Sequence, residues 1–140
     1  MKSPTGGKLI VFQSTLPNHL DGALKQRDDP KIYNTSKESQ ALHPSTDFYK
    51  ITSVEHSRSQ IGIDLFLFGG QYLDVATLGC LSKHSGGSIY YYPNFTAQRR
   101  EDVIKFKTEL VELLTRPLGL EAVLRVRASK GIIFITFPDT

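Results

Sequence analysis

Cysteine is almost absent from this 140-residue sequence, and long hydrophobic runs are missing altogether. The single cysteine, Cys80, cannot form an internal disulfide, and one thiol cannot build a cysteine-rich zinc site. No apolar stretch approaches the ~20 residues that a membrane-spanning helix needs, and the opening MKSPTGG lacks the apolar core of a secretion signal. These absences favour a cytoplasmic protein.

Motifs of catalysis and cofactor binding are also lacking. The sequence has no GxxxxGK[ST] loop, no GxGxxG after a strand and no GxSxG elbow. Its four histidines have neither the i, i+4 nor the HExxH spacing of a metal site, and no dyad of carboxylates is present. We therefore predict that the chain is not an enzyme.

Positive and negative charges nearly balance: the net charge is +3 and the isoelectric point is near 9.0. This balance suits an anionic partner, although such an excess is more often an ordinary solvated surface. Charges between residues 18 and 45 are mixed in sign, so nothing there indicates a nucleic-acid site. The hydrophobic content of 39% predicts a folded core.

The strongest structural signal runs from residue 61 to residue 92. The run IGIDLFLF (61–68) predicts a buried strand that ends at Gly69 and Gly70. LDVATLGCLS (73–82) predicts one short helix, which Gly86 and Gly87 end. SIYYY (88–92), closed by Pro93, predicts a second strand in which Tyr91 faces opposite to Tyr90 and Tyr92, with at least one face packed against the helix expected after Pro93. Strand, helix and strand form one parallel βαβ unit.

Weaker signals precede this unit. KLIVFQ (8–13) predicts a short strand, and the polar stretch 18–45 predicts a long connection with a helical turn only at residues 23–26. A connection of this length usually has a function or contacts a partner. A helix is expected from about 46 to 59, with one face formed by Phe48, Ile51, Thr52 and Glu55.

A stronger helix is predicted after Pro93. It would begin near Thr96 and end before Pro117 and Gly119. A continuous apolar stripe marks its inner face: Val103, Phe106, Leu110, Val111, Leu113 and Leu114. In the last segment, EAVLRVRAS (121–129) alternates, Lys130-Gly131 is a turn signal, and residues 132–137 are apolar, which predicts an antiparallel hairpin. The fold class is therefore α/β, a parallel sheet followed by a short hairpin.

Arg125 and Arg127 are the main candidate binding residues. Two residues apart on a strand, their guanidinium groups would point the same way and suit carboxylates or phosphates. The alternative is an ordinary charged strand face that prevents edge pairing. Asp64, the one acid within an apolar strand, could bind a metal or cap a neighbouring element, and capping is favoured. Gly69-Gly70 is read as a turn rather than a phosphate cradle, and Cys80 as a packed thiol.

Several motifs, taken in order, resemble those of one family. They are GGKLIVFQSTLP (6–17), DPK (29–31), TDFYK (46–50), DLFLF (64–68), QYLDVATLG (71–79), GGSIYYYP (86–93), and AVLRVR with KG (122–131). Together they resemble the cargo-adaptor subunit of the COPII vesicle coat, the Sec24 family. The resemblance covers nearly the whole chain, and QYLDVATLG and YYYP distinguish it from the related coat subunit with GTPase-activating function.

This resemblance implies a division of the chain. Residues 1–118 correspond to the C-terminal half of a trunk domain of the von Willebrand factor A type, a doubly wound sheet. Residues 119–140 correspond to the first strands of the β-sandwich that follows the trunk, truncated here. The zinc-finger module of the family lies outside this correspondence, so we expect no cofactor in the chain.

The resemblance also implies a function in cargo selection for transport from the endoplasmic reticulum to the Golgi. In the family, the trunk pairs with the partner coat subunit, and the assembled face lies peripherally on the membrane of the endoplasmic reticulum. Arg125 and Arg127 match arginines of a pocket that captures acidic sorting signals on cargo. The expected partners are thus the coat subunit, cargo signals and an anionic membrane surface, without nucleic acid.

Two other interpretations remain. One is a small α/β nucleotide-binding protein or enzyme that uses Ser14, Gly69 and Gly70 at the strand ends. The other is a divalent-metal adhesion module of the same fold, which the absence of a DxSxS motif disfavours.

Overall fold

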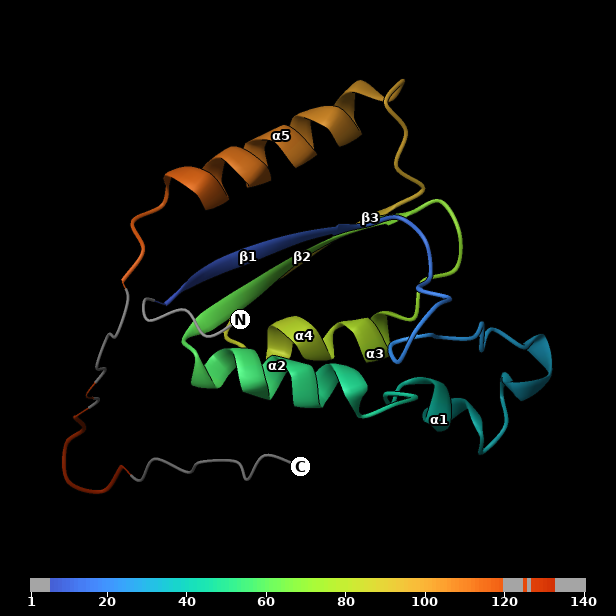
Figure 1. Ribbon diagram of the computed structural model, residues 1–140, viewed down its shortest axis with the longest axis horizontal. Helices are drawn as coiled ribbons and strands as arrows, with labels where there is room; N and C mark the ends of the chain where they lie inside the picture. The colour runs from blue at the N-terminus through green and yellow to red at the C-terminus, as the bar shows by residue number, and fades with distance from the viewer. Residues whose placement is uncertain (1–5, 120–124, 126, 133–140) are drawn as a thin grey trace.

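The computed structural model describes residues 6–119, 125 and 127–132, and Figure 1 shows its elements. In chain order they are β1 (Gly7–Gln13), the 3-10 turn η1 (Pro30–Ile32), α1 (Glu38–Ala41), α2 (Phe48–Arg58), β2 (Ile61–Gly69), α3 (Val75–Leu78), α4 (Cys80–Lys83), β3 (Ile89–Pro93) and α5 (Arg100–Thr115).

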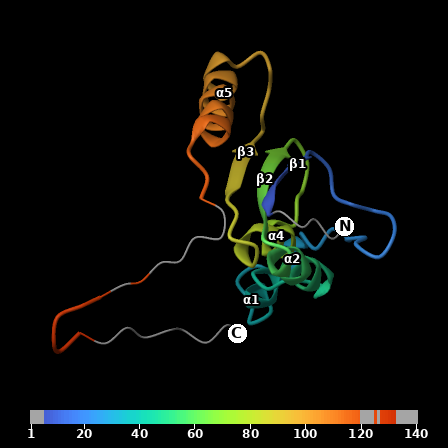
Figure 2. The ribbon, with the colours of Figure 1, turned by 60° about the vertical axis from the view of Figure 1, so that its left-hand side comes forward.

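The three strands form one parallel sheet in the order β1-β2-β3. The register pairs Gly7 with Ile61 and Leu65 with Ile89. Helices α2, α3 and α4 cover one face of the sheet, and α5 covers the other, as Figures 1 and 2 show. A sheet with helices on both faces confirms the predicted α/β class, because parallel strands require crossovers that place helices on the faces.

Strand β2 lies at the centre and is covered on both sides. Ile63, Leu65 and Leu67 face the α2 side, whereas Asp64 and Phe66, both 0% exposed, point to the α5 side. This two-sided burial explains why the sequence of β2 shows no polar alternation apart from one aspartate. The predicted strand is confirmed.

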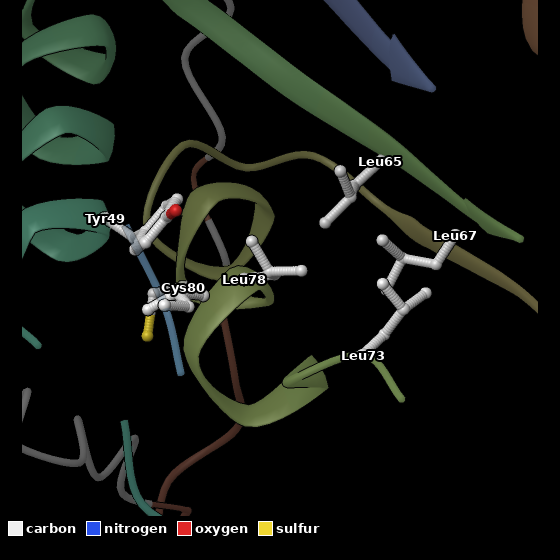
Figure 3. Packing of buried hydrophobic residues seen from close by; sticks show 7 residues of the cluster. Tyr49, Leu65, Leu67, Leu73, Leu78 and Cys80 are labelled. Atoms are coloured by element: carbon white, nitrogen blue, oxygen red, sulfur yellow. The ribbon is translucent and has the colours of Figure 1, made fainter. Parts of the chain in front are cut away.

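The core on the α2 side is aliphatic. Leu65 and Leu67 of β2 meet Leu73, Leu78 and Cys80, and Tyr49 of α2 closes the far side (Figure 3). Leu24, from the long connection, completes the cluster. Burial of these side chains is the main stabilising contribution on this face, at roughly 1.5–3 kcal/mol for each fully buried large aliphatic group.

The core on the α5 side is aromatic. Phe66 stacks on Tyr90 with ring centroids 4.4 Å apart, Phe68 stacks on Tyr92 at 5.2 Å, and Phe106 of α5 meets both phenylalanines edge-on. Tyr91 points to the opposite face and is 44% exposed. The alternation predicted for the three tyrosines, with packing against the long helix, is therefore confirmed.

Three helix predictions require correction. The single helix expected over 73–82 is two short helices separated by Gly79, since glycine is a poor helix former. Residues 23–26 form no helical turn, and α5 begins at Arg100 rather than near Thr96. Ala23 and Leu24 instead donate their N–H groups to carbonyls of residues 20 and 17, which close a turn.

The face predicted for α2 is also wrong. Ile51 is 57% exposed and Phe48 lies outward as well, whereas Tyr49 and Ser53 are buried. The hydroxyl of Tyr49 donates to the carbonyl of Gly22, and Ser53 Oγ donates to the Leu81 carbonyl at 2.6 Å. Because these polar groups find partners in the interior, α2 can bury them in place of its more apolar side.

Only part of the stripe predicted for α5 packs on the sheet. Phe106, Leu110 and Leu113 contact the aromatic core, but Val103, Val111 and Leu114 are exposed. A helix lying on a sheet buries one narrow face, so residues at the margins of a wider apolar stripe remain exposed to solvent.

The predicted hairpin is not confirmed. Its described residues, Arg125 and residues 127–132, have no strand conformation. Lys130 and Gly131 form the expected turn, which the bond from Ile132 N to Ser129 O closes at 3.3 Å. The remaining residues of the predicted hairpin lie outside the described part of the chain.

Candidate functional site

The carboxyl end of the sheet is where α/β folds commonly bind ligands. A cavity at the end of β2 is lined by Ser14, Phe68, Gly70, Phe95 and Phe106. Three of the five lining residues are phenylalanines and none is basic. The Gly70 N–H donates to the Phe68 carbonyl at 3.0 Å and so closes a turn. This geometry fits the turn interpretation of Gly69-Gly70 and offers nothing that would hold a phosphate.

A polar cluster beside this edge, in which Asp74 and Thr77 are buried, anchors the long connection between β1 and α2. We call it the loop clamp, and it consists of Arg27, Ser45, Asp74 and Thr77. The Arg27 guanidinium donates to both carboxylate oxygens of Asp74, at 3.0 Å from Nε and 2.7 Å from Nη2. Ser45 N donates to Thr77 Oγ1 at 2.9 Å. The clamp thus ties two points of the connection to the start of α3.

Asp74 is the centre of the loop clamp and is only 2% exposed. Besides binding Arg27, it caps α3 by accepting the Thr77 N–H at 3.1 Å and the Thr77 hydroxyl at 2.7 Å. The hydrogen bonds to Asp74 raise the pKa of the Arg27 guanidinium above its ordinary value. The bidentate pairing with Arg27 compensates the cost of burying the Asp74 carboxylate. Removal of Arg27 would leave that charge buried without a partner.

Arg27 also organises the connection itself. Its Nη1 donates to the carbonyl of Gln40 at 3.3 Å and to the carbonyl of His43 at 3.1 Å. Sequence reasoning missed this role, because Arg27 lies among charges of mixed sign with no local partner. The helix cap at Asp74 had a local signal, an aspartate three residues before a threonine. Its ion pair with Arg27 had none, because the two residues lie 47 positions apart in the sequence.

Asp64 fulfils the capping role that was favoured over metal binding. Its carboxylate accepts the Ser88 N–H at 2.8 Å, just before β3, and forms an ion pair with Lys8 Nζ at 2.6 Å. Within residues 6–119, 125 and 127–132, no group of three histidine, cysteine or acidic side chains could hold a metal ion. Through its two contacts, the side chain of Asp64 links β1 and β2 to the residue just before β3.

Cys80 is buried in the α2-side core, as predicted for a packed thiol. Burial raises the pKa of the thiol, which keeps it protonated and unreactive near neutral pH. His56 is half-buried, and its Nδ1 lies 2.7 Å from the carbonyl of Thr52. His19 and His43 are exposed. His84, just after α4, is half-buried and donates its backbone N–H to the Cys80 carbonyl at 3.3 Å.

The predicted binding residues Arg125 and Arg127, which follow α5 in the chain, are each exposed, and neither has helix or strand conformation. Their role in binding therefore stays a prediction. No helix within the described ranges is long and apolar enough to cross a lipid bilayer.

Comparisons with known proteins match this fold. Residues 1–114 match the family described as the Sec23/Sec24 trunk domain. Over 135 residues, 96% of the chain, it is 50% identical to protein transport protein sec24 of Aspergillus clavatus and 47% identical to that of Neurospora crassa. Those stretches cover 15% and 14% of the two relatives, so the chain spans about one seventh of their length.

A solved structure agrees with the sequence relatives. The crystal structure of the human COPII-coat protein Sec24c matches with a TM-score of 0.72 and 38% identity. The match covers 78% of this chain and 15% of that one. The similarity therefore extends from sequence to the arrangement of sheet and helices.

Proposed function

This chain belongs to the Sec23/Sec24 trunk domain family, and from this membership we propose that it acts in a COPII vesicle coat, as part of a cargo-adaptor subunit. The observation that carries the proposal is the extent of the match to Sec24 relatives, which runs through nearly the whole chain. The matched region includes β2 and the loop clamp, which lies beside the carboxyl end of the sheet.

The proposed role is selection of cargo for transport from the endoplasmic reticulum to the Golgi. We assign capture of acidic sorting signals to Arg125 and Arg127, which are exposed and carry planar guanidinium groups suited to carboxylates. In an extended segment, side chains two residues apart point to the same side, so both arginines could engage one signal.

The proposal includes a partner and a location. The trunk would pair with the COPII partner subunit, and the coat would place the chain in the cytoplasm, peripherally on the endoplasmic reticulum membrane and on vesicles. The chain would act by binding rather than by catalysis.

Co-expression with the COPII partner subunit tests this proposal. The 140-residue chain would carry an affinity tag, and complexes would be isolated by pull-down and size-exclusion chromatography. We expect a soluble complex of one copy of each chain. Circular dichroism of the purified chain would show whether it is folded. A folded chain that elutes alone, beside a full-length adaptor that does form the complex, would contradict the proposal.

A further inference from the structure

A second cavity lies on the connection between β1 and α2, beside the start of α3 and away from Arg125 and Arg127. We call it the tyrosine cavity. It has a volume of about 240 Å³, and its walls include Asp28, Ile32, Tyr33, Leu42, Tyr72 and Val75. The connection that carries four of these residues extends past the end of the sheet, next to α3 (Figure 1).

The size of the tyrosine cavity limits what it can hold. Pockets for cofactors and drug-sized ligands usually measure ~300–1,000 Å³. This cavity is smaller, yet it exceeds the space of a single water molecule by a wide margin. A single side chain of another polypeptide is the ligand that fits its volume.

Among the residues that the structure describes, the ion pairs around the cavity leave the carboxylate of Asp28 without a cationic partner. Arg27 and Asp74, both at the cavity wall, neutralise each other in the loop clamp. Asp28 accepts a hydrogen bond from the Tyr33 hydroxyl through Oδ1, which leaves Oδ2 available. Among the described residues, the ion pairs join Lys8 to Asp64, Arg27 to Asp74 and Arg99 to Asp102, so none includes Asp28.

Aromatic rings supply the second attraction. Tyr33 and Tyr72 both line the cavity, and the face of an aromatic ring attracts a cation through its quadrupole. The aliphatic groups of Ile32, Leu42 and Val75 would cover the methylene stem of a long side chain, as apolar surfaces do for lysine and arginine.

We propose that the tyrosine cavity binds an arginine or lysine side chain of a partner protein. The methylene stem lies against the aliphatic wall, and the cationic head lies between the tyrosine rings and the free oxygen of Asp28. This site differs from the proposed acidic-signal site in position and in the sign of the charge that it recognises. Loss of one function would therefore leave the other intact.

The test is a titration of the full chain with N-acetyl-arginine amide, followed by the backbone amide signals in two-dimensional NMR spectra. We expect saturable shifts at Tyr33, Tyr72 and Val75. The neutral isostere N-acetyl-citrulline amide should bind about fivefold more weakly, because it lacks the charge that the rings and Asp28 attract.

Asp28→Asn provides the matched variant, since asparagine keeps an oxygen for the Tyr33 hydroxyl but removes the charge. Affinity for the arginine probe should fall about threefold, whereas Asp21→Asn, an exposed aspartate that does not line the cavity, should leave it unchanged. Equal binding of the arginine and citrulline probes would overturn the proposal, as would an unchanged affinity in Asp28→Asn. Tighter binding of N-acetyl-leucine amide would show an apolar site instead.

Discussion

Asp74 shows how one buried residue can organise a distant segment. Its carboxylate caps α3 and binds Arg27, whose guanidinium also holds the carbonyls of Gln40 and His43. The connection between β1 and α2 contains no strand and only short helical turns, so these polar contacts and Leu24 supply much of its attachment to the core.

The first prediction concerns this clamp. Arg27→Ala should lower the free energy of unfolding by about 2–4 kcal/mol, because it leaves the carboxylate of Asp74 buried without its cation. Urea denaturation followed by circular dichroism measures the change. Arg99→Ala is the control: its ion pair with Asp102 is 3.4 Å long and the Arg99 side chain is 55% exposed, so the cost should stay below about 1 kcal/mol. Equal costs in both variants would argue against the clamp.

The second prediction concerns the exposed arginines. The Arg125→Ala/Arg127→Ala double variant should lose saturable binding of an acidic sorting peptide, measured by fluorescence anisotropy. Binding by the unmodified chain should weaken as salt rises, since exposed charges are screened. Lys130→Ala removes an exposed cation from the same segment and should change binding much less. If the unmodified chain and the double variant behave alike, the role assigned to these arginines is wrong.

At the scale of elements, the entry into β3 is the tightest junction. A Cβ atom added to Gly87 would overlap the backbone of Ile63 in the neighbouring strand, so only glycine allows this approach. Gly87→Ala should therefore destabilise the chain by about 3 kcal/mol or more, measured by thermal or urea unfolding. Gly70→Ala is the matched control, because a Cβ there would meet no atom within 4 Å. A Gly87 variant as stable as the Gly70 variant would contradict this packing.

The contact between β3 and α5 predicts a pH dependence. The hydroxyl of Tyr92 donates to the carboxylate of Glu109, and Lys105 Nζ lies 5.1 Å from the centre of the Tyr92 ring. Burial, followed by the hydrogen bond to Glu109, raises the pKa of Tyr92 above its ordinary value of about 10. The folded state thus holds this proton more tightly than the unfolded state does.

The sign follows from linkage. The stabilisation from Tyr92 is fully present below a pH of about 10 and is lost as the pH rises above it. The pKa values of Tyr49 and Cys80 are also raised by burial and act in the same direction. Urea titrations at increasing pH should therefore show falling stability above pH ~10. Tyr92→Phe should reduce this slope. An unchanged slope would show that the hydroxyl of Tyr92 does not contribute.

At the scale of the whole molecule, one edge of the sheet, strand β1, is left partly uncovered. α5 packs on the aromatic cluster, while Leu9 and Phe12 of β1 remain exposed on the edge of the sheet. Within the described residues, β1 has a strand neighbour on one side only. The one charge of β1, on Lys8, is paired with Asp64, so this mostly apolar edge strand can readily pair with another chain.

We therefore expect the isolated chain to self-associate. Leu9→Lys, which places a charge on the β1 edge, should reduce the average mass measured by sedimentation at micromolar concentration. Leu20→Lys is the control, because Leu20 is 92% exposed but lies in the connection rather than on the strand. Equal effects of the two variants, or a monomeric chain, would contradict an association through β1.

The sequence alone predicts the three parallel strands and the long helix after Pro93. Their signals are local: β2 is apolar on both faces, and α5 carries an apolar stripe. It also predicted the orientation of the three tyrosines, since side chains alternate along a strand. The order of its motifs also indicated the family.

The buried side of α2 and the attachment of the long connection depend on contacts between residues far apart in the sequence. α2 buries Tyr49 and Ser53 because acceptors 27 and 28 residues away satisfy their hydroxyls, and Arg27 meets Asp74 across 47 residues. The spacing of apolar residues predicts the buried face of a helix from neighbouring residues alone. A polar group, however, is buried only when a partner elsewhere in the fold forms a hydrogen bond with it. Hydrogen bonds between remote residues leave no periodic pattern in the sequence, so the loop clamp and the tyrosine cavity become visible only in the folded chain.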